Sequence, residues 1–268
     1  MSLYRVALLI LLGQLLIRET IIWYNHPHPN LLPFEGVFRP DNDFGKVYLV
    51  SPFLVNGTVV QYLKKHPNVR RLLLLLDALS GLSYLHRNKI VHGDLKGANV
   101  LVDSQGRACL ADLGLSRLTD AQILTWTSIQ TTSPPWGTLP WQAPELLSAQ
   151  LQYSEHFPTP TTSSDVYAFG CLAYEIFTGL LPFAELSTGG WSYIQVHRTI
   201  STQVVVHGRR PQKPGANDPA YLRYGLTDGI WDMMEKCWKH EARRRPSADD
   251  LSGLPFLVDV LDDRPVQE

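Results

Sequence analysis

The residues best suited to chemistry lie in one short stretch, "IVHGDLKGANVLV", at residues 90–102. Within it, Asp94, Lys96 and Asn99 stand on a predicted loop between two aliphatic runs, and Asp112 follows the next apolar run in "ADLG". Phosphoryl transfer from a magnesium nucleotide needs a carboxylate that accepts a proton, a nearby cation, and oxygen ligands for a hard metal ion. The pattern therefore indicates a phosphotransferase site, with turn-forming polar residues as the alternative interpretation.

The rest of the sequence predicts the elements that must position this stretch. Apolar residues at helical spacing predict a helix over 16–25, which ends at the prolines of "HPHPN". The runs "LLPFEGVF" and "KVYLVS" predict two short strands, and residues 58–86 predict helical structure with leucines on more than one face. Residues 164–179 predict a central helix that is capped by Ser164 and ends at Gly179.

This order of elements indicates an α+β chain with two unequal parts. Residues 1–50 would form a small part with one helix and two strands, 51–57 the junction, and 58–260 a larger, mainly helical part. The 268 residues, of which 44% are hydrophobic, are enough for one large domain or two lobes around a buried core. The polar stretch 119–140 has the length of a functional or disordered loop.

Charge, cysteine content and hydropathy exclude several classes of function. The net charge of −1 gives no electrostatic basis for binding nucleic acid. Cys109, Cys171 and Cys237 match no metal-ligand spacing, which predicts buried free thiols in a reducing, cytoplasmic compartment. The apolar run 6–17 is shorter than the roughly 20 residues that cross a bilayer. No small-residue cleavage site follows it, so membrane attachment or secretion is the lesser alternative.

The chain resembles a protein kinase catalytic domain, and within that family the tyrosine-kinase-like group of serine/threonine kinases. Three of the family's motifs occur in order: H-R-D-x-x-x-x-N at 92–99, D-F-G at 112–114 and A-P-E at 143–145. The resemblance covers residues 16–255. It implies a two-lobe kinase fold, ATP and Mg²⁺ as cofactors, and a protein substrate.

The resemblance also implies a role for each catalytic residue. Asp94 would be the base that accepts the substrate's hydroxyl proton, and Lys96 would neutralise the transferred phosphate, as in serine/threonine kinases. Thr138 would tie the substrate loop to both of them, and Asn99 and Asp112 would hold Mg²⁺.

A nucleotide site is implied at the junction "LVSPFLVNG". Ser51 would be the gatekeeper residue, and Pro52 would offer only its carbonyl to adenine because proline has no N–H. The donor would be the N–H of Leu54, and Leu101 would form the floor beneath the adenine.

The resemblance assigns supporting roles to residues that do not touch the nucleotide. Asp165 would hold the backbone of the catalytic loop, and His92 would be a packed core histidine. Arg245 would pair with Glu145 in a buried ion pair, whose loss would cost stability. Glu19 falls where the family has a helix glutamate.

The chain departs from the family pattern at three places. Gly93 replaces the arginine that meets an activation-loop phosphate, so loop phosphorylation is not the expected mode of activation. Leu113 replaces phenylalanine at a packing position. The eighteen residues ahead of Glu19 contain no lysine and one glycine, and the first lysine in the sequence is Lys46.

The motifs support one leading hypothesis, and the third departure adds two alternatives. The leading hypothesis is an ATP- and Mg²⁺-dependent serine/threonine kinase with a truncated small lobe. The second is a catalytically impaired pseudokinase that acts as a scaffold, because losing one electrostatic contributor costs about 10²–10³ in rate. The third is an incomplete kinase whose glycine-rich loop and strand lysine are encoded upstream.

Overall fold

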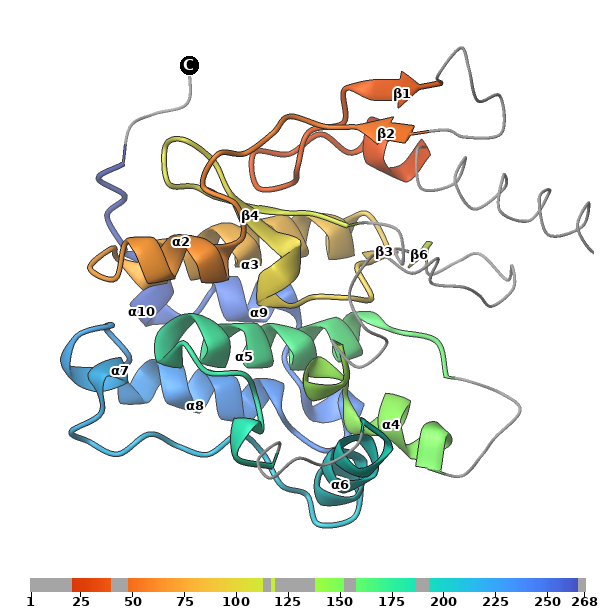
Figure 1. Ribbon diagram of the computed structural model, residues 1–268, viewed down its shortest axis with the longest axis vertical. Coiled ribbons are helices and arrows are strands. Elements are labelled where there is room, and N and C mark those ends of the chain that lie inside the picture. Colours follow the sequence, from red (N-terminus) through yellow and green to blue (C-terminus); the bar gives the residue numbers. More distant parts are fainter. Residues whose placement is uncertain are drawn as a thin grey trace, which may run out of the picture.

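The computed structural model describes residues 21–39, 48–112, 117–118, 138–151, 158–186 and 193–264. Figure 1 shows β1 and β2 above a larger portion that consists mainly of helices. Residues 21–25, the described part of the predicted first helix, are helical and lie beside these two strands.

The described elements follow one another in a simple order. The strands are β1 (Gly36–Phe38), β2 (Tyr48–Val50), β3 (Ile90–Val91), β4 (Val100–Val102), β5 (Ala108–Leu110) and β6 (Arg117–Leu118). The helices are α2 (Val59–Lys65), α3 (Arg71–Arg87), α4 (Pro144–Leu151), α5 (Thr162–Thr178), α6 (Tyr193–Val205), α7 (Pro219–Leu222), α8 (Asp228–Cys237), α9 (Ala248–Ser252) and α10 (Pro255–Val258).

The strands pair as three antiparallel two-stranded sheets, β1–β2, β3–β6 and β4–β5. In the β4–β5 hairpin, Leu101 lies opposite Cys109. An isolated bridge joins Thr58, at the end of the junction, to Leu101, and a second joins Leu31 to Leu110. The β4–β5 hairpin therefore connects the small portion, the junction and the helical portion.

The long predicted helical region is two helices. The helical structure is interrupted between α2 and α3, at residues 66–70, where Pro67 lacks a backbone N–H donor. Thr58 and Gln61 form a capping box at the start of α2. The continuous run of apolar residues conceals this break, because both helices bury leucines.

Helix α5 is at the centre of the helical portion, and every residue from Ser164 to Phe177 is buried. Its cap differs from the sequence prediction. Thr161, not Ser164, is the N-cap: its hydroxyl accepts the N–H of Ser164 at 3.2 Å, and Ser164 completes a capping box as the third helical residue. Gly179 ends the helix with φ = 72°, as predicted.

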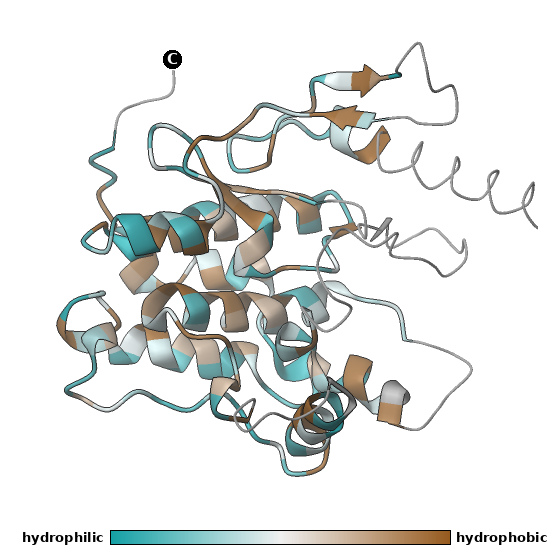
Figure 2. Cartoon of the chain, in the orientation of Figure 1, coloured by the Kyte–Doolittle hydropathy of each residue, from teal (hydrophilic) through white to brown (hydrophobic). Residues whose placement is uncertain are grey.

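The main core forms where α3, α5, α8 and the β4–β5 hairpin meet. Figure 2 shows apolar residues along much of α3 and α5. Cys109, Cys171 and Cys237 are free and buried, which confirms the packing predicted for them. Among the described helices, none is long and apolar enough to span a membrane.

Candidate active site

Helix α5 fixes the turn that precedes Asp94. The carboxylate of Asp165, in the first turn of α5, accepts the N–H of His92 at 2.7 Å and the N–H of Gly93 at 2.8 Å. Nε2 of His86 lies 2.9 Å from the same carboxylate. Because Asp165 is buried, these bonds are shielded from competing water and hold the loop backbone in a single geometry.

Three of the predicted catalytic side chains are in direct contact. Nζ of Lys96 donates to Oδ2 of Asp94 at 2.8 Å and to Oγ1 of Thr138 at 2.9 Å. Asp94 and Lys96 are only 7% and 6% exposed. The second carboxylate oxygen of Asp94, Oδ1, is buried and has no hydrogen-bond partner in the described part of the chain. It is therefore an acceptor that lacks a donor.

The two predicted metal ligands are linked through the backbone. Nδ2 of Asn99 donates to the carbonyl oxygen of Asp94 at 2.8 Å and to its Oδ2 at 2.9 Å, which leaves the amide oxygen for another ligand. The N–H of Ala111 donates to the carbonyl of Asn99 at 2.8 Å, next to Asp112. Asp112 adopts φ = 61°, a left-handed conformation that is strained outside glycine and often marks functional sites.

These donor atoms fit the cofactors that the sequence predicts. Mg²⁺ is held by oxygen ligands, commonly one or two from the protein together with phosphates and water. Asn99 offers an amide oxygen and Asp112 a carboxylate. The orphaned oxygen of Asp94 lies in the same loop, where it can accept a hydroxyl proton.

A residue that sequence reasoning missed supports this loop from behind. Oε2 of Glu175, on α5, accepts the N–H of Gly97 at 2.9 Å. A Cβ at position 97 would lie 2.7 Å from that carboxylate, so any other residue would require Glu175 to move away from the loop. Burial raises the pKa of Glu175 to about 7, against the opposing effects of the Gly97 N–H and the charge of Lys96. The signal in the sequence was an acidic residue within the apolar run of a buried helix.

The predicted nucleotide-binding residues are all half-buried: Ser51, Pro52, Leu54 and Leu101. The N–H of Gly57 donates to the carbonyl of Leu54 at 3.0 Å, and the N–H of Val102 donates to the carbonyl of Gly57 at 2.9 Å. These bonds join the junction to β4, the strand that carries Leu101. The junction and the predicted adenine floor are thus neighbours in the structure.

Glu145 and Arg245 form a bidentate ion pair, with two contacts of 2.7 Å. The guanidinium of Arg245 also donates to the carbonyls of Ser163 and Lys239, and its side chain is fully buried. The pair therefore joins α4 to the start of α5 and to the segment that follows α8. Glu19 lies outside the described residues, as do Leu113 and most of the polar stretch 119–140.

Comparisons with known proteins bear directly on this site. Residues 13–254 match the family described as protein tyrosine and serine/threonine kinase. Serine/threonine-protein kinase STY17 of Arabidopsis thaliana is 28% identical over 252 residues, which are 92% of this chain and 38% of that protein. Probable serine/threonine-protein kinase SIS8 of the same plant is 33% identical over 238 residues, 86% of this chain and 20% of that protein.

A third relative extends the range of organisms. Mitogen-activated protein kinase kinase kinase 1b of Physcomitrium patens is 29% identical over 235 residues, 86% of this chain and 26% of that protein. The chain spans less than two fifths of the length of each of these three relatives. The predicted resemblance and the two-lobe α+β fold class are confirmed, and the chain belongs to the protein kinase family.

Proposed function

We propose that the chain transfers the terminal phosphoryl group of MgATP to serine or threonine hydroxyls of a protein substrate. The observation that carries this proposal is the state of Asp94. Its Oδ2 is held by Lys96 and Asn99, while its Oδ1 is buried and unpartnered. A carboxylate oriented through one oxygen and free at the other is prepared to accept a proton from a hydroxyl group.

The remaining residues of the site would each have a separate role in the transfer. MgATP supplies the phosphoryl group, whose transfer passes through a loose transition state, so the protein contributes mainly positioning and charge stabilisation. Lys96 places a positive charge beside Asp94, and Thr138 holds that ammonium in position. Asn99 and Asp112 would hold the metal ion through their side-chain oxygens.

The junction would receive the adenine. Leu54 would donate its backbone N–H, Pro52 would offer its carbonyl, and Ser51 would border the inner end of the site. Leu101 would lie beneath the ring, because the bridge to Thr58 keeps β4 against the junction. Serine and threonine are the expected acceptors because the relatives are named as serine/threonine kinases.

A phosphoryl-transfer assay tests the proposal. The full chain is incubated with radiolabelled MgATP and casein, and the phosphorylated amino acids are identified. We expect label on serine or threonine, and a rate lower by about 10²–10⁴ in Asp94→Asn because the proton acceptor is lost. Asp249→Asn, an exposed carboxylate on α9, should keep the full rate. Equal rates in Asp94→Asn and the unaltered chain would refute the assignment.

The same assay decides the alternative, a catalytically impaired kinase that acts as a binding module. In that case the chain should fold with the site described above and transfer no label in the same assay. Label that appears on serine or threonine, and depends on Asp94, would exclude it.

A further inference from the structure

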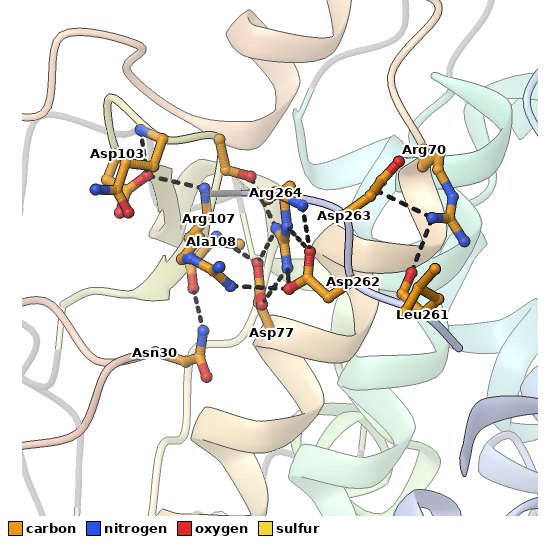
Figure 3. Close-up of polar contacts among 12 residues, drawn as sticks. Asn30, Arg70, Asp77, Asp103, Arg107, Ala108, Leu261, Asp262, Asp263 and Arg264 are labelled. Carbon is orange, nitrogen blue, oxygen red and sulfur yellow. Dashed lines mark hydrogen bonds and ion pairs between the residues drawn. The ribbon is translucent and has the colours of Figure 1, made fainter. Parts of the chain in front are cut away.

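A second polar network joins the end of the described chain to α3 and the β4–β5 hairpin (Figure 3). Its members on the C-terminal side belong to the segment Leu261–Arg264, which follows α10. This C-terminal segment lies beyond residues 13–254, the part that matches the kinase family. Its contacts therefore add to those of the matched domain.

Arg264 makes the most buried contacts of this network. Its guanidinium donates to both carboxylate oxygens of Asp77, at 2.6 and 2.9 Å, and to the carbonyl of Gly106 at 2.9 Å. Arg264 and Asp77 are 187 positions apart, and their side chains are 14% and 9% exposed. A bidentate pair with so little exposure is geometrically specific and weakly screened by salt.

The other ion pairs hold the segment in place around Arg264. Asp262 accepts hydrogen bonds from Arg264 and, at 2.9 Å, from Arg107. The hydrogen bond from Arg264 holds the pKa of the Asp262 carboxyl well below its usual range. Arg70 contacts Asp263 at 3.1 Å, but both side chains are largely exposed, so this pair contributes little.

Asp77 connects this network to the proposed nucleotide site. Ala108 is the first residue of β5, and its N–H donates to Oδ2 of Asp77 at 2.8 Å. Strand β5 pairs with the strand that carries Leu101, and the chain reaches Asp112 two residues after β5 ends. The same carboxylate therefore binds the C-terminal segment and anchors the strand that leads to Asp112.

We propose that Arg264 is a positioning residue for the nucleotide site: it orients Asp77, and through Asp77 it sets the β4–β5 hairpin that carries Leu101 and leads to Asp112. This inference rests on the proposed kinase function. Without Arg264, the carboxylate of Asp77 loses its bidentate partner at a buried position, and it must rotate or admit water to recover its solvation. Either change weakens its bond to Ala108.

The first test measures the hairpin directly. Amide hydrogen exchange at Ala108 is followed by NMR in the full chain, in Arg264→Ala and in the milder Arg264→Lys. We expect exchange about tenfold faster in Arg264→Ala, an intermediate rate in Arg264→Lys, and unchanged rates for the buried amides of α5. Arg243→Ala is the matched control, because that arginine is exposed and pairs with Glu241. Unchanged exchange at Ala108 in both Arg264 variants would overturn the inference.

The second test separates positioning from simple attachment of the chain end. In Arg264→Ala we expect the KM for ATP to rise about 5- to 20-fold and kcat to change less than twofold. The rise in KM lies at the low end of the affinity changes that coupling between two sites produces. Arg264→Lys should recover part of the loss. Faster exchange at Ala108 with an unchanged KM would overturn the positioning role. If the unaltered chain binds no nucleotide, the proposed function and the positioning role fail together, and the exchange rates still show whether Arg264 orders β5.

Discussion

Nζ of Lys96 lies 2.8 Å from Oδ2 of Asp94, and both side chains are more than nine-tenths buried. Two charges at this depth are stable only when each is paired, because the desolvation of a lone ion costs several kcal/mol. Thr138 and Asn99 occupy further hydrogen-bonding positions around the pair. The catalytic loop therefore pairs its two buried charges and leaves Oδ1 of Asp94 as a buried acceptor that has no hydrogen-bond partner among the described residues.

Replacing Lys96 should affect both chemistry and stability. We expect Lys96→Ala to reduce phosphoryl transfer by about 10²–10³, because a positive charge at the reacting centre is lost. It should also lower the free energy of unfolding by about 3–5 kcal/mol, because Asp94 is left buried and unpaired. Urea denaturation measures the second effect. Lys213→Ala removes an exposed ion pair with Asp228, and it should change stability by less than about 1 kcal/mol. Equal stabilities of the two variants would contradict this description of the loop.

The ion pair between Glu145 and Arg245 should be structural. Arg245→Ala removes five side-chain hydrogen bonds, two of them to Glu145, from a fully buried position. We expect the free energy of unfolding to fall by about 3 kcal/mol, because three backbone carbonyls lose a buried donor, whereas Glu145 is 33% exposed and can be solvated. Arg243→Ala, two positions earlier and largely exposed, should change it by no more than about 0.5 kcal/mol. Chemical denaturation measures the free energy of unfolding of both variants. A loss in Arg245→Ala as small as that in Arg243→Ala would show that the ion pair does not contribute to stability.

Glu175 should make stability depend on pH. Burial raises its pKa from 4.5 to about 7 in the folded chain. Between these pH values the folded state keeps a proton that the unfolded state has released. The contribution of Glu175 to stability therefore falls as pH rises from about 4.5 to 7, by roughly 3 kcal/mol at most.

Glu175→Gln tests this dependence, because glutamine still offers an oxygen to the N–H of Gly97 and does not ionise. We expect the variant to gain stability relative to the unaltered chain between pH 5 and pH 8, in urea titrations at both values. A stability difference that is the same at both pH values would mean that Glu175 does not titrate in this range.

The sequence was most informative where the interacting residues are close in the chain. Lys96 and Asn99 both contact Asp94, and all three lie within six positions of the sequence. The sequence motif was therefore enough to predict that they lie together. Contacts between distant residues had a signal only where the family motifs imply them, as for Glu145 and Arg245 across 100 positions. Glu175 meets Gly97 across 78 positions and Arg264 meets Asp77 across 187, and nothing in the sequence identifies these partners. The sequence does show that Asp77 and Glu175 are acidic residues within largely apolar helical segments. A buried carboxylate in such a segment needs a partner.

Errors at element boundaries have equally local causes. The segment "TPTTSSD" contains several hydroxyl residues that could cap α5, and only backbone geometry selects Thr161 over Ser164. The break between α2 and α3 at residues 66–70 is short and flanked by leucines, so the apolar pattern continues across it.

Binding of MgATP to the full chain and to Asp112→Asn is the most direct test of the proposed site. A ligand that binds only the folded state raises stability by RT ln(1 + [L]/Kd), so thermal shift detects even weak binding at high nucleotide concentration. We expect Mg²⁺-dependent stabilisation of the full chain that is lost in Asp112→Asn. No stabilisation at nucleotide concentrations of about 1–10 mM, or equal stabilisation of both proteins, would contradict the assignment of this site to MgATP.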